Sequence, residues 1–246
     1  SAGERAFDCQ RSGRRPAEQS RGKRVTAVGG PRLPPPSSMS VSSDLEDLLM
    51  AYLEAAFHAT LHARGVYPPE LFEPRRVLDV PVRIARHPAL KVYLRDAVLS
   101  VREAMTKGPV ERVELVLLPA AGFEPVPFER HVFDLGATRL RAAAGEMSDD
   151  DLDVVEQGLR ASLSHISRLD HRLARPLGET TFAIIVHTPE SFDLTRQEDL
   201  QLAEKWVPEP IDDAQTGGHR EVHAVKHVSL RSFRMSHYVE ATTPGG

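Results

Sequence analysis

The sequence predicts one two-layer domain of the α/β or α+β class, in which helices pack on a sheet. Three segments carry apolar residues at the three- and four-residue spacing of a helix with one buried face. Strand-like runs stand between and after these segments, so the helices and strands come in mixed order. With 246 residues, of which 41% are hydrophobic and 27% charged, the chain can bury one ordinary core.

The first helix is predicted from Ser43 to about Gly65, because Ser43 and Glu46 form a capping-box pattern at its start. Its apolar stripe consists of Leu45, Leu48, Leu49, Tyr52, Leu53, Phe57 and Leu61. Residues 66–77 (VYPPELFEPRRV) contain too much proline for a helix interior and predict an irregular connector. Residues 78–85 (LDVPVRIA) predict a short strand.

The second helix is predicted from Pro88, since proline suits a first turn, to just before Gly108. Its stripe is Leu90, Leu94, Ala97, Val101 and Met105. Residues 110–119 (VERVELVLLP) alternate apolar and charged side chains and then become wholly apolar, which is typical of a strand entering a core. Residues 124–135 (EPVPFERHVFDL) predict its antiparallel partner, with a bulge or a change of exposed face between Phe128 and Phe133.

The third helix is predicted to begin at Ser148, with Asp151 three residues on. Its stripe is Leu152, Val155, Leu159, Leu163 and Ile166. Residues 180–188 (TTFAIIVHT) form the most hydrophobic strand and are expected near the centre of the sheet. Two further strand-like runs, within residues 221–241, follow a polar loop near the end of the chain.

The sequence carries no pattern typical of an enzyme, so we expect no catalytic residue and no cofactor. A Gly-rich phosphate loop, a nucleophile elbow, an HExxH helix and paired CxxC motifs are all absent. Cys9 is the single cysteine and has no partner for an internal disulfide. His58 and His62 have zinc-like spacing, but Ala59 follows where a metalloprotease has glutamate, so no metal site is expected.

Three later histidines share one parity and are expected on one face of a strand, most simply as solvated residues: His219, His223 and His227. No apolar run approaches the roughly 20 residues of a membrane-spanning helix. We therefore expect a soluble intracellular protein without a membrane partner.

An N-terminal extension, residues 1–38, differs in net charge from the rest of the chain. Residues 1–38 contain eight basic and three acidic residues, ten Gly or Pro, and no apolar periodicity, which predicts a disordered basic extension. It is either a solvated segment, upstream of a natural start at Met39, or an arm for nucleic acid or nuclear import. The acidic remainder argues against direct nucleic-acid binding by the folded domain.

Five features of the body occur in the order seen in a known family. They are residues 55–72 (AAFHATLHARGVYPPELF), residues 80–98 (VPVRIARHPALKVYLRDAV), residues 180–188, the lone Trp206 and residues 233–241 (FRMSHYVEA). They resemble the HORMA-domain proteins that serve as accessory subunit of DNA polymerase zeta, the repair branch of the mitotic arrest deficient-like spindle checkpoint proteins. The resemblance runs from Leu45 to Ala241, and the basic extension has no counterpart in it.

This resemblance implies an α+β HORMA domain over residues 39–241, with three main helices on a mostly antiparallel sheet and a flexible tail over residues 242–246. Residues 200–241 would be a safety belt that closes over a partner peptide added as an edge strand. Tyr93 and Trp206 would contact that peptide, although Tyr93 is also consistent with an ordinary helix tyrosine. Lys205 precedes Trp206, where the family has proline.

The resemblance also implies further interfaces. Val222, Ser236 and Tyr238 would contact a translesion scaffold polymerase; Val222 stands where the family has leucine, and Ser236 differs from the family residue. Arg160 would serve a homodimer and is equally consistent with an ordinary solvent-exposed arginine.

The implied function is that of a non-catalytic adaptor. Its partners would be the catalytic subunit of polymerase zeta, the C-terminal domain of the scaffold polymerase, a shieldin subunit in double-strand-break repair, and an AAA+ remodelling ATPase. The location would be the nucleus, with the cytoplasm and the spindle. Two alternatives stay open: a checkpoint protein that sequesters an anaphase-promoting-complex activator, and a nucleic-acid-binding module that uses the basic extension.

Overall fold

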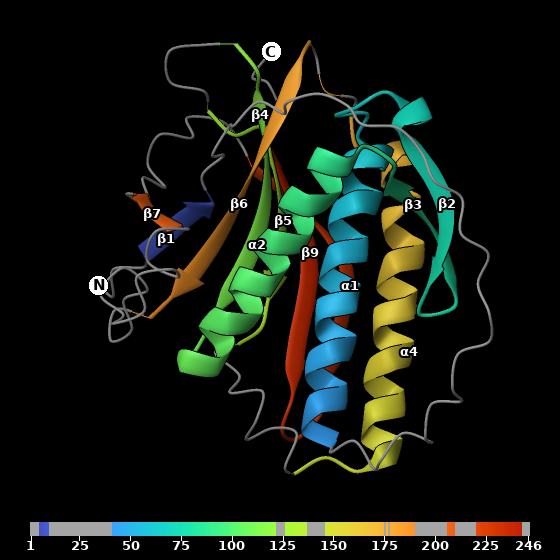
Figure 1. Ribbon diagram of the computed structural model, residues 1–246, viewed down its shortest axis with the longest axis vertical. Helices are drawn as coiled ribbons and strands as arrows, with labels where there is room; N and C mark the ends of the chain where they lie inside the picture. The colour runs from blue at the N-terminus through green and yellow to red at the C-terminus, as the bar shows by residue number, and fades with distance from the viewer. Residues whose placement is uncertain are drawn as a thin grey trace, which may run out of the picture.

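Three helices cover one face of a sheet in the computed structural model (Figure 1). The structure describes residues 5–9, 41–121, 126–136, 146–174, 176, 178–189, 206–209 and 220–242. The helices are α1 (Val41–Ala63), α2 (Pro88–Lys107) and α4 (Asp149–Ile166). This arrangement confirms the predicted α+β class with three main helices, and no helix among the described residues is long and apolar enough to cross a bilayer.

The main sheet has seven strands in the order β7-β1-β6-β4-β5-β9-β8, and all its described pairings are antiparallel. The strands are β1 (Arg5–Cys9), β4 (Arg112–Pro119), β5 (Glu129–Asp134), β6 (Thr180–Thr188), β7 (Trp206–Glu209), β8 (Arg220–Ser229) and β9 (Arg234–Thr242). The last segment of the chain thus supplies β7 at one edge of the sheet, and β8 with β9 at the other.

A separate hairpin of β2 (Phe72–Val77) and β3 (Val80–Ala85) follows the short 3-10 helix η1 (Pro69–Leu71). Its turn residues Leu78 and Asp79 have φ of 47° and 58°, the left-handed geometry of a tight hairpin turn. Residues 72–77 are therefore a strand, and the connector predicted for residues 66–77 is wrong in its second half. Pro74 is tolerated there because β2 has a described partner on one side only.

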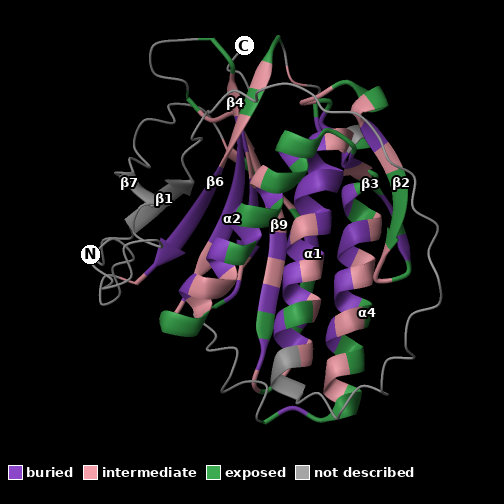
Figure 2. Ribbon diagram, viewed as in Figure 1, coloured by how far each residue is buried: buried purple, intermediate pink, exposed green. Residues whose placement is uncertain are grey.

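The core lies between the helices and the sheet (Figure 2). Tyr52 and Phe57 of α1 make edge-to-face contacts with Phe133 of β5, at ring-centroid distances of 5.9 and 5.6 Å. All three side chains are fully buried. The predicted apolar stripes face this core, because a helix buries the side chains that recur every three to four residues.

The third helix begins as predicted. The Ser148 hydroxyl accepts a hydrogen bond from the Asp151 amide at 3.2 Å, and the Asp151 carboxylate accepts one from the Ser148 amide at 3.0 Å. These two hydrogen bonds satisfy two backbone donors that a helix start would otherwise leave unpaired. The bonds that the Asp151 carboxylate accepts from the Ser148 amide and hydroxyl lower the pKa of Asp151.

Three local predictions are corrected. Helix α1 begins at Val41, so Ser43 lies inside the helix and is not its cap. The register of β5 runs from Glu129 to Asp134 without interruption, and the irregularity in the sheet lies in β8 instead, between Ala224 and Lys226. Residues 5–9 of the extension expected to be disordered form β1, while its other residues lie outside the described part.

Candidate functional site

The outer edge of β6 is only half occupied. On its inner side β6 pairs with β4 from Thr180 to His187, whereas on its outer side β1 pairs only with residues 185–188. No described strand pairs with residues 180–184 on that side, and Figure 1 shows β1 and β7 beside the C-terminal end of β6. An unpaired strand edge presents amide and carbonyl groups that can add another strand.

Part-buried aromatic side chains lie beside the unoccupied part of this edge. Phe182 of β6 contacts Tyr93 of α2 at a ring-centroid distance of 5.6 Å and Tyr67 of the connector at 6.3 Å, both edge to face. Rings of this kind suit an interface because they offer apolar area while the tyrosine hydroxyls can remain hydrated. The structure thus places Tyr93 next to the edge where a peptide strand would lie, and its contact with a peptide stays a prediction.

Strand β7 joins the sheet through β1 alone among the described strands. Trp206, the first residue of β7, pairs with Cys9, while its side chain lies outside the described part of the chain. Pro208 in the same strand is compatible with this position, because β7 ends the sheet and a proline needs no ladder donor on an open side. The belt residue and the half-open edge therefore lie at the same side of the molecule.

A second candidate surface lies at the opposite edge, on the sheet face away from the helices. Met235, His237 and Val239 of β9 are buried on the helix side, so the alternating Ser236 and Tyr238 face the other way. Val222 of β8 pairs with Glu240 and shares that face; it is 61% exposed. The structure therefore brings Val222, Ser236 and Tyr238 together, and their role in an interface stays a prediction.

Local contacts hold this second surface in place. The Ser236 hydroxyl and His227 Nδ1 are hydrogen-bonded at 2.8 Å. Burial, helped by the Glu240 charge, raises the pKa of Tyr238, while Arg112 acts in the opposite direction.

The bulge in β8 corrects the prediction for the late histidines. His223 pairs with Val239 and His227 with Ser236, residues on opposite faces of the sheet, so His223 and His227 do not share a face. His219 lies outside the described residues.

A buried charged cluster lies between the two surfaces, on the same outer face. Glu114 contacts His187 at 2.9 Å, Arg130 at 3.0 Å and Arg112 at 3.8 Å. Burial alone would raise the pKa of Glu114, but the close contact with His187 and the charges of the three partners outweigh it and lower the pKa to about 2. The cluster cross-links β4, β5 and β6, the strands that lie between the two surfaces.

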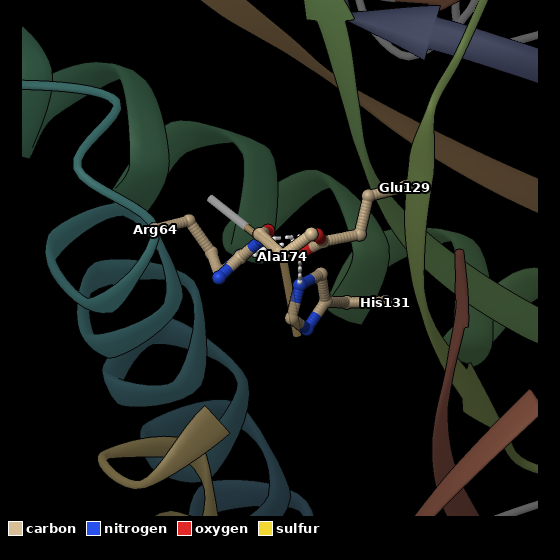
Figure 3. Close-up of polar contacts among 4 residues, drawn as sticks. All are labelled: Arg64, Glu129, His131 and Ala174. Carbon is tan, nitrogen blue, oxygen red and sulfur yellow. Dashed lines mark hydrogen bonds and ion pairs between the residues drawn. The ribbon is translucent and has the colours of Figure 1, made fainter. Parts of the chain in front are cut away.

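A second buried ion pair ties the end of α1 to the sheet (Figure 3). Arg64 donates to both oxygens of Glu129 at 2.8 to 3.1 Å and also to the carbonyl of Ala174, and Glu129 contacts His131 at 2.7 Å. Burial would raise the pKa of Glu129, but His131 and Arg64 lower it. This geometry is that of a fork-shaped, charge-assisted structural contact.

Arg160 makes ion pairs within the chain. Its guanidinium lies 2.5 Å from Glu156 of the same helix and 3.1 Å from Asp79 in the β2–β3 turn, and the side chain is 37% exposed. These contacts link α4 to the hairpin. The homodimer role predicted for Arg160 is not tested by them and stays a prediction.

The two early histidines occupy different environments. His58 is fully buried, and its Nδ1 accepts a hydrogen bond from the Ala85 amide at 3.3 Å. Burial, and to a smaller extent the Lys91 charge, lowers the pKa of His58 to about 4. The ring of His62 packs on Phe72, and the described part of the chain contains no cluster of three or more potential metal ligands.

Comparison with known proteins identifies the family. No family model matches the chain. The sequence is 32% identical over 199 residues to the "Mitotic spindle assembly checkpoint protein MAD2B" of Danio rerio, a match that covers 80% of this chain and 90% of that protein. The chain belongs to the MAD2B family. The human MAD2B protein is 37% identical over 145 residues, which cover 59% of this chain and 66% of that protein.

A more distant relative agrees with the MAD2B assignment, and solved structures show the fold. The "DNA polymerase zeta subunit 2" of Drosophila melanogaster is 25% identical over 174 residues, 70% of this chain and 84% of that protein. A chain in the "Crystal Structure of Mitotic Checkpoint Complex" superimposes with a TM-score of 0.64 at 19% identity, covering 80% of this chain and 98% of that chain. The structure of HTP-2 bound to HTP-3 motif-6 superimposes with a TM-score of 0.58 at 11% identity, covering 85% of this chain and 95% of that chain. These neighbours confirm the predicted HORMA fold.

The sequence alone did not indicate every residue of the candidate site. Phe182 was read only as part of a hydrophobic strand, and Tyr67 only as part of a proline-rich connector. The signal for Tyr67 was an aromatic residue directly before Pro68 and Pro69, outside any apolar stripe. For Phe182 no local pattern separates a core position from one beside an open strand edge.

Proposed function

We propose that the protein is a non-catalytic adaptor that binds an extended peptide of a partner as a strand on the outer edge of β6, beneath β7. One observation carries the proposal: among the described strands, β7 is connected to the sheet only through a strand that lies between it and β6. A strand in this position forms main-chain hydrogen bonds on both sides, so binding uses the backbone while the aromatic side chains nearby select the sequence.

The names of the relatives suggest the partner. The Drosophila melanogaster relative is a DNA polymerase zeta subunit, and the Arabidopsis thaliana relative is a "DNA polymerase zeta processivity subunit". HTP-2, a structural neighbour, was solved with a motif of HTP-3 bound to it. The partner proposed for the β6 edge is therefore a peptide of the catalytic subunit of polymerase zeta, bound by Tyr93, Phe182 and the belt residue Trp206.

The second surface supports a bridging role. Val222, Ser236 and Tyr238 would receive the C-terminal domain of a translesion scaffold polymerase. In other assemblies the same β6 edge would hold a shieldin peptide in break repair, and an AAA+ ATPase would reopen the belt, in the nucleus and, during mitosis, at the spindle. Arg160 would support a homodimer.

Calorimetric titration of the full chain with a synthetic catalytic-subunit peptide tests the first proposal. Tyr93→Ala should weaken binding by more than about 1 kcal/mol, because a central aromatic anchor loses its contacts. Leu99→Ala is the matched control, since Leu99 is an exposed apolar residue of the same helix and is not part of the aromatic cluster. Thermal unfolding of each variant separates lost contact from lost fold.

The checkpoint function is the second candidate, because the Danio rerio relative is named a spindle assembly checkpoint protein. If the folded chain does not bind the polymerase peptide but binds a peptide of an anaphase-promoting-complex activator, the proposed strand-addition site is correct. The checkpoint function then replaces the polymerase function. If neither peptide binds, the proposed site is wrong.

A further inference from the structure

We propose that residues 5–9 of the chain are an internal competitor of the partner peptide: they occupy the strand position between β6 and β7 and must leave before the partner can bind there. This inference rests on the proposed function, because it concerns the same strand position. Its basis is that β1, a segment of this same chain, is the strand that lies between β6 and β7 in the structure.

The register of β1 is that of a strand inserted between two others. Arg5 to Asp8 pair with Thr188 to Ile185 of β6, and Ala6 to Cys9 pair with Glu209 to Trp206 of β7. Removing β1 would leave β6 with a bare outer edge along its whole length and β7 without a described neighbour. Any other peptide that joins β6 under β7 must therefore take the backbone positions that β1 holds.

Pro208 determines which residues of β1 form hydrogen bonds with β7 and which form them with β6. It pairs with Phe7 but has no amide hydrogen, so this pair cannot exchange two hydrogen bonds. Bonded and non-bonded pairs alternate in an antiparallel ladder, which assigns the bonds with β7 to Ala6–Glu209 and Asp8–Val207. The amide of Phe7 then points to β6, where Phe7 pairs with Val186. A proline at position 7 would remove a donor to β6 and leave the ladder to β7 intact.

The internal strand fills the site incompletely. It has five residues, whereas β6 has nine, and it leaves residues 180–184 and the adjoining Phe182, Tyr93 and Tyr67 without a strand beside them in the described part of the chain. A partner peptide that extends along these residues gains main-chain bonds and aromatic contacts that β1 does not make. A longer partner can therefore replace β1.

Covalent attachment makes the short strand an effective competitor. Residues 10–40 connect β1 to α1, which is 31 residues. A tethered segment competes at an effective concentration that is set by the linker and does not depend on the concentration of the protein. If it fills the site about nine-tenths of the time, the apparent affinity of a partner is lower by about tenfold.

The chain provides its own probe for this exchange. It contains one cysteine, Cys9, and one tryptophan, Trp206, and the two are directly paired between β1 and β7. Opposite residues in an antiparallel pair have Cα atoms only about 4.5 to 5.5 Å apart. A bimane dye attached to Cys9 of the full chain is therefore quenched by Trp206 when β1 is in place, and its emission rises when β1 leaves.

The experiment compares the labelled wild type with Phe7→Pro, Phe7→Ala and Trp206→Phe. We expect the wild type and Phe7→Ala to be quenched, because both keep the amide at position 7, and Phe7→Pro to be bright. Trp206→Phe should be bright regardless of peptide. Adding the synthetic catalytic-subunit peptide should raise the wild-type emission to a plateau. Calorimetry on the unlabelled chains should give binding to Phe7→Pro on the order of tenfold tighter than to wild type.

The outcomes separate this inference from the proposed function. If the labelled wild type is as bright as Trp206→Phe, and the peptide binds wild type and Phe7→Pro equally, the internal competitor is overturned while the adaptor function stands. If quenching is present and is relieved by Phe7→Pro, but no peptide binds any variant, the adaptor function fails and β1 is merely a strand of the sheet. Quenching that disappears on dilution would show that β1 comes from a second copy, and would overturn competition within one chain.

Discussion

At the scale of single residues, the Arg64–Glu129 pair is a buried charged contact that needs both of its partners. Its side chains are 1% and 3% exposed, so loss of the carboxylate charge leaves a guanidinium buried without a counter-charge. We predict that Glu129→Gln lowers the free energy of unfolding by about 3 to 5 kcal/mol, measured by urea denaturation. Glu73→Gln is the control: it removes an exposed pair with Arg75 and should leave the urea midpoint unchanged. Equal effects of the two variants would contradict the argument.

His58 makes stability depend on pH in a defined window. Its pKa is lowered from 6.5 to about 4 by burial, with a smaller effect of Lys91. Below pH 6.5 His58 is protonated in the unfolded chain, whereas in the folded chain it stays neutral until about pH 4. Its contribution to stability is therefore complete above pH 6.5 and is lost as the pH falls from 6.5 to about 4. His237, whose pKa burial also lowers, acts in the same direction.

Removing the His58 titration should therefore flatten the pH dependence. His58→Asn keeps an acceptor for the Ala85 amide, and we predict that the slope of unfolding free energy against pH in this window falls by up to about 1.4 kcal/mol per pH unit. Urea denaturation at several pH values measures the slope. An unaltered slope in His58→Asn would show that His58 is not the titrating group.

Residue identity alone indicated few of these contacts. The apolar stripes were predictable because their spacing is local, and Tyr93 could be singled out from a family resemblance. Arg64 and Glu129 are 65 residues apart, and no local pattern shows that one buried charge will meet the other. In the sequence Glu114 is one of several charged residues in an alternating strand. Only the fold brings His187, Arg130 and Arg112 around it.

At the scale of elements, helix α4 and strand β8 approach each other closely at one glycine. A Cβ added at Gly158 would lie 2.3 Å from Cγ2 of Val228, and a β-branched side chain has little freedom to move aside. We predict that Gly158→Ala lowers the free energy of unfolding by about 1 to 3 kcal/mol through overpacking.

The effect of Gly158→Ala on the free energy of unfolding should reverse its sign when Val228 is shortened. In a Val228→Ala background the clash disappears, and Gly158→Ala should be neutral or stabilising by up to about 1 kcal/mol, because alanine favours a helix over glycine. A four-variant cycle measured by urea denaturation checks this. Gly158→Ala that stabilises the wild-type background would mean that the strand moves away freely.

Elements with local signals were predictable, and elements defined by distant partners were not. The Ser148–Asp151 cap is a contact over three residues and appears in the structure as the sequence predicts. Strand β1 has neither an apolar period nor turn residues; its pairing depends on the vacant edge of β6 and on β7, which are supplied from the far end of the chain. The β8 bulge likewise depends on register with β9 and reverses the face of His227.

At the scale of the whole molecule, the two candidate surfaces lie at opposite sides of one sheet. The peptide position is at β1, next to β6, and the Val222 surface is on β8 and β9; β6, β4 and β5 lie between them. With neighbouring strands about 4.8 Å apart, the two are separated by roughly 20 Å, beyond the distance at which separate contacts usually influence each other. Two partners bound at the two proposed surfaces would therefore not compete for space, and the cross-linked sheet would set their spacing.

This separation predicts independent binding. Val222→Glu places a charge in the exposed apolar position of the second surface and should abolish binding of the scaffold polymerase domain, while the affinity for the catalytic-subunit peptide stays within twofold, or about 0.4 kcal/mol. Val154→Glu is the matched control, because Val154 is an exposed valine of α4 outside both surfaces, and it should alter neither affinity. Calorimetric titration of each partner, alone and in the presence of the other, measures both affinities. If Val222→Glu weakens peptide binding as much as scaffold binding, the surfaces are coupled through the segment that joins β7 to β8, and the sheet does not insulate them.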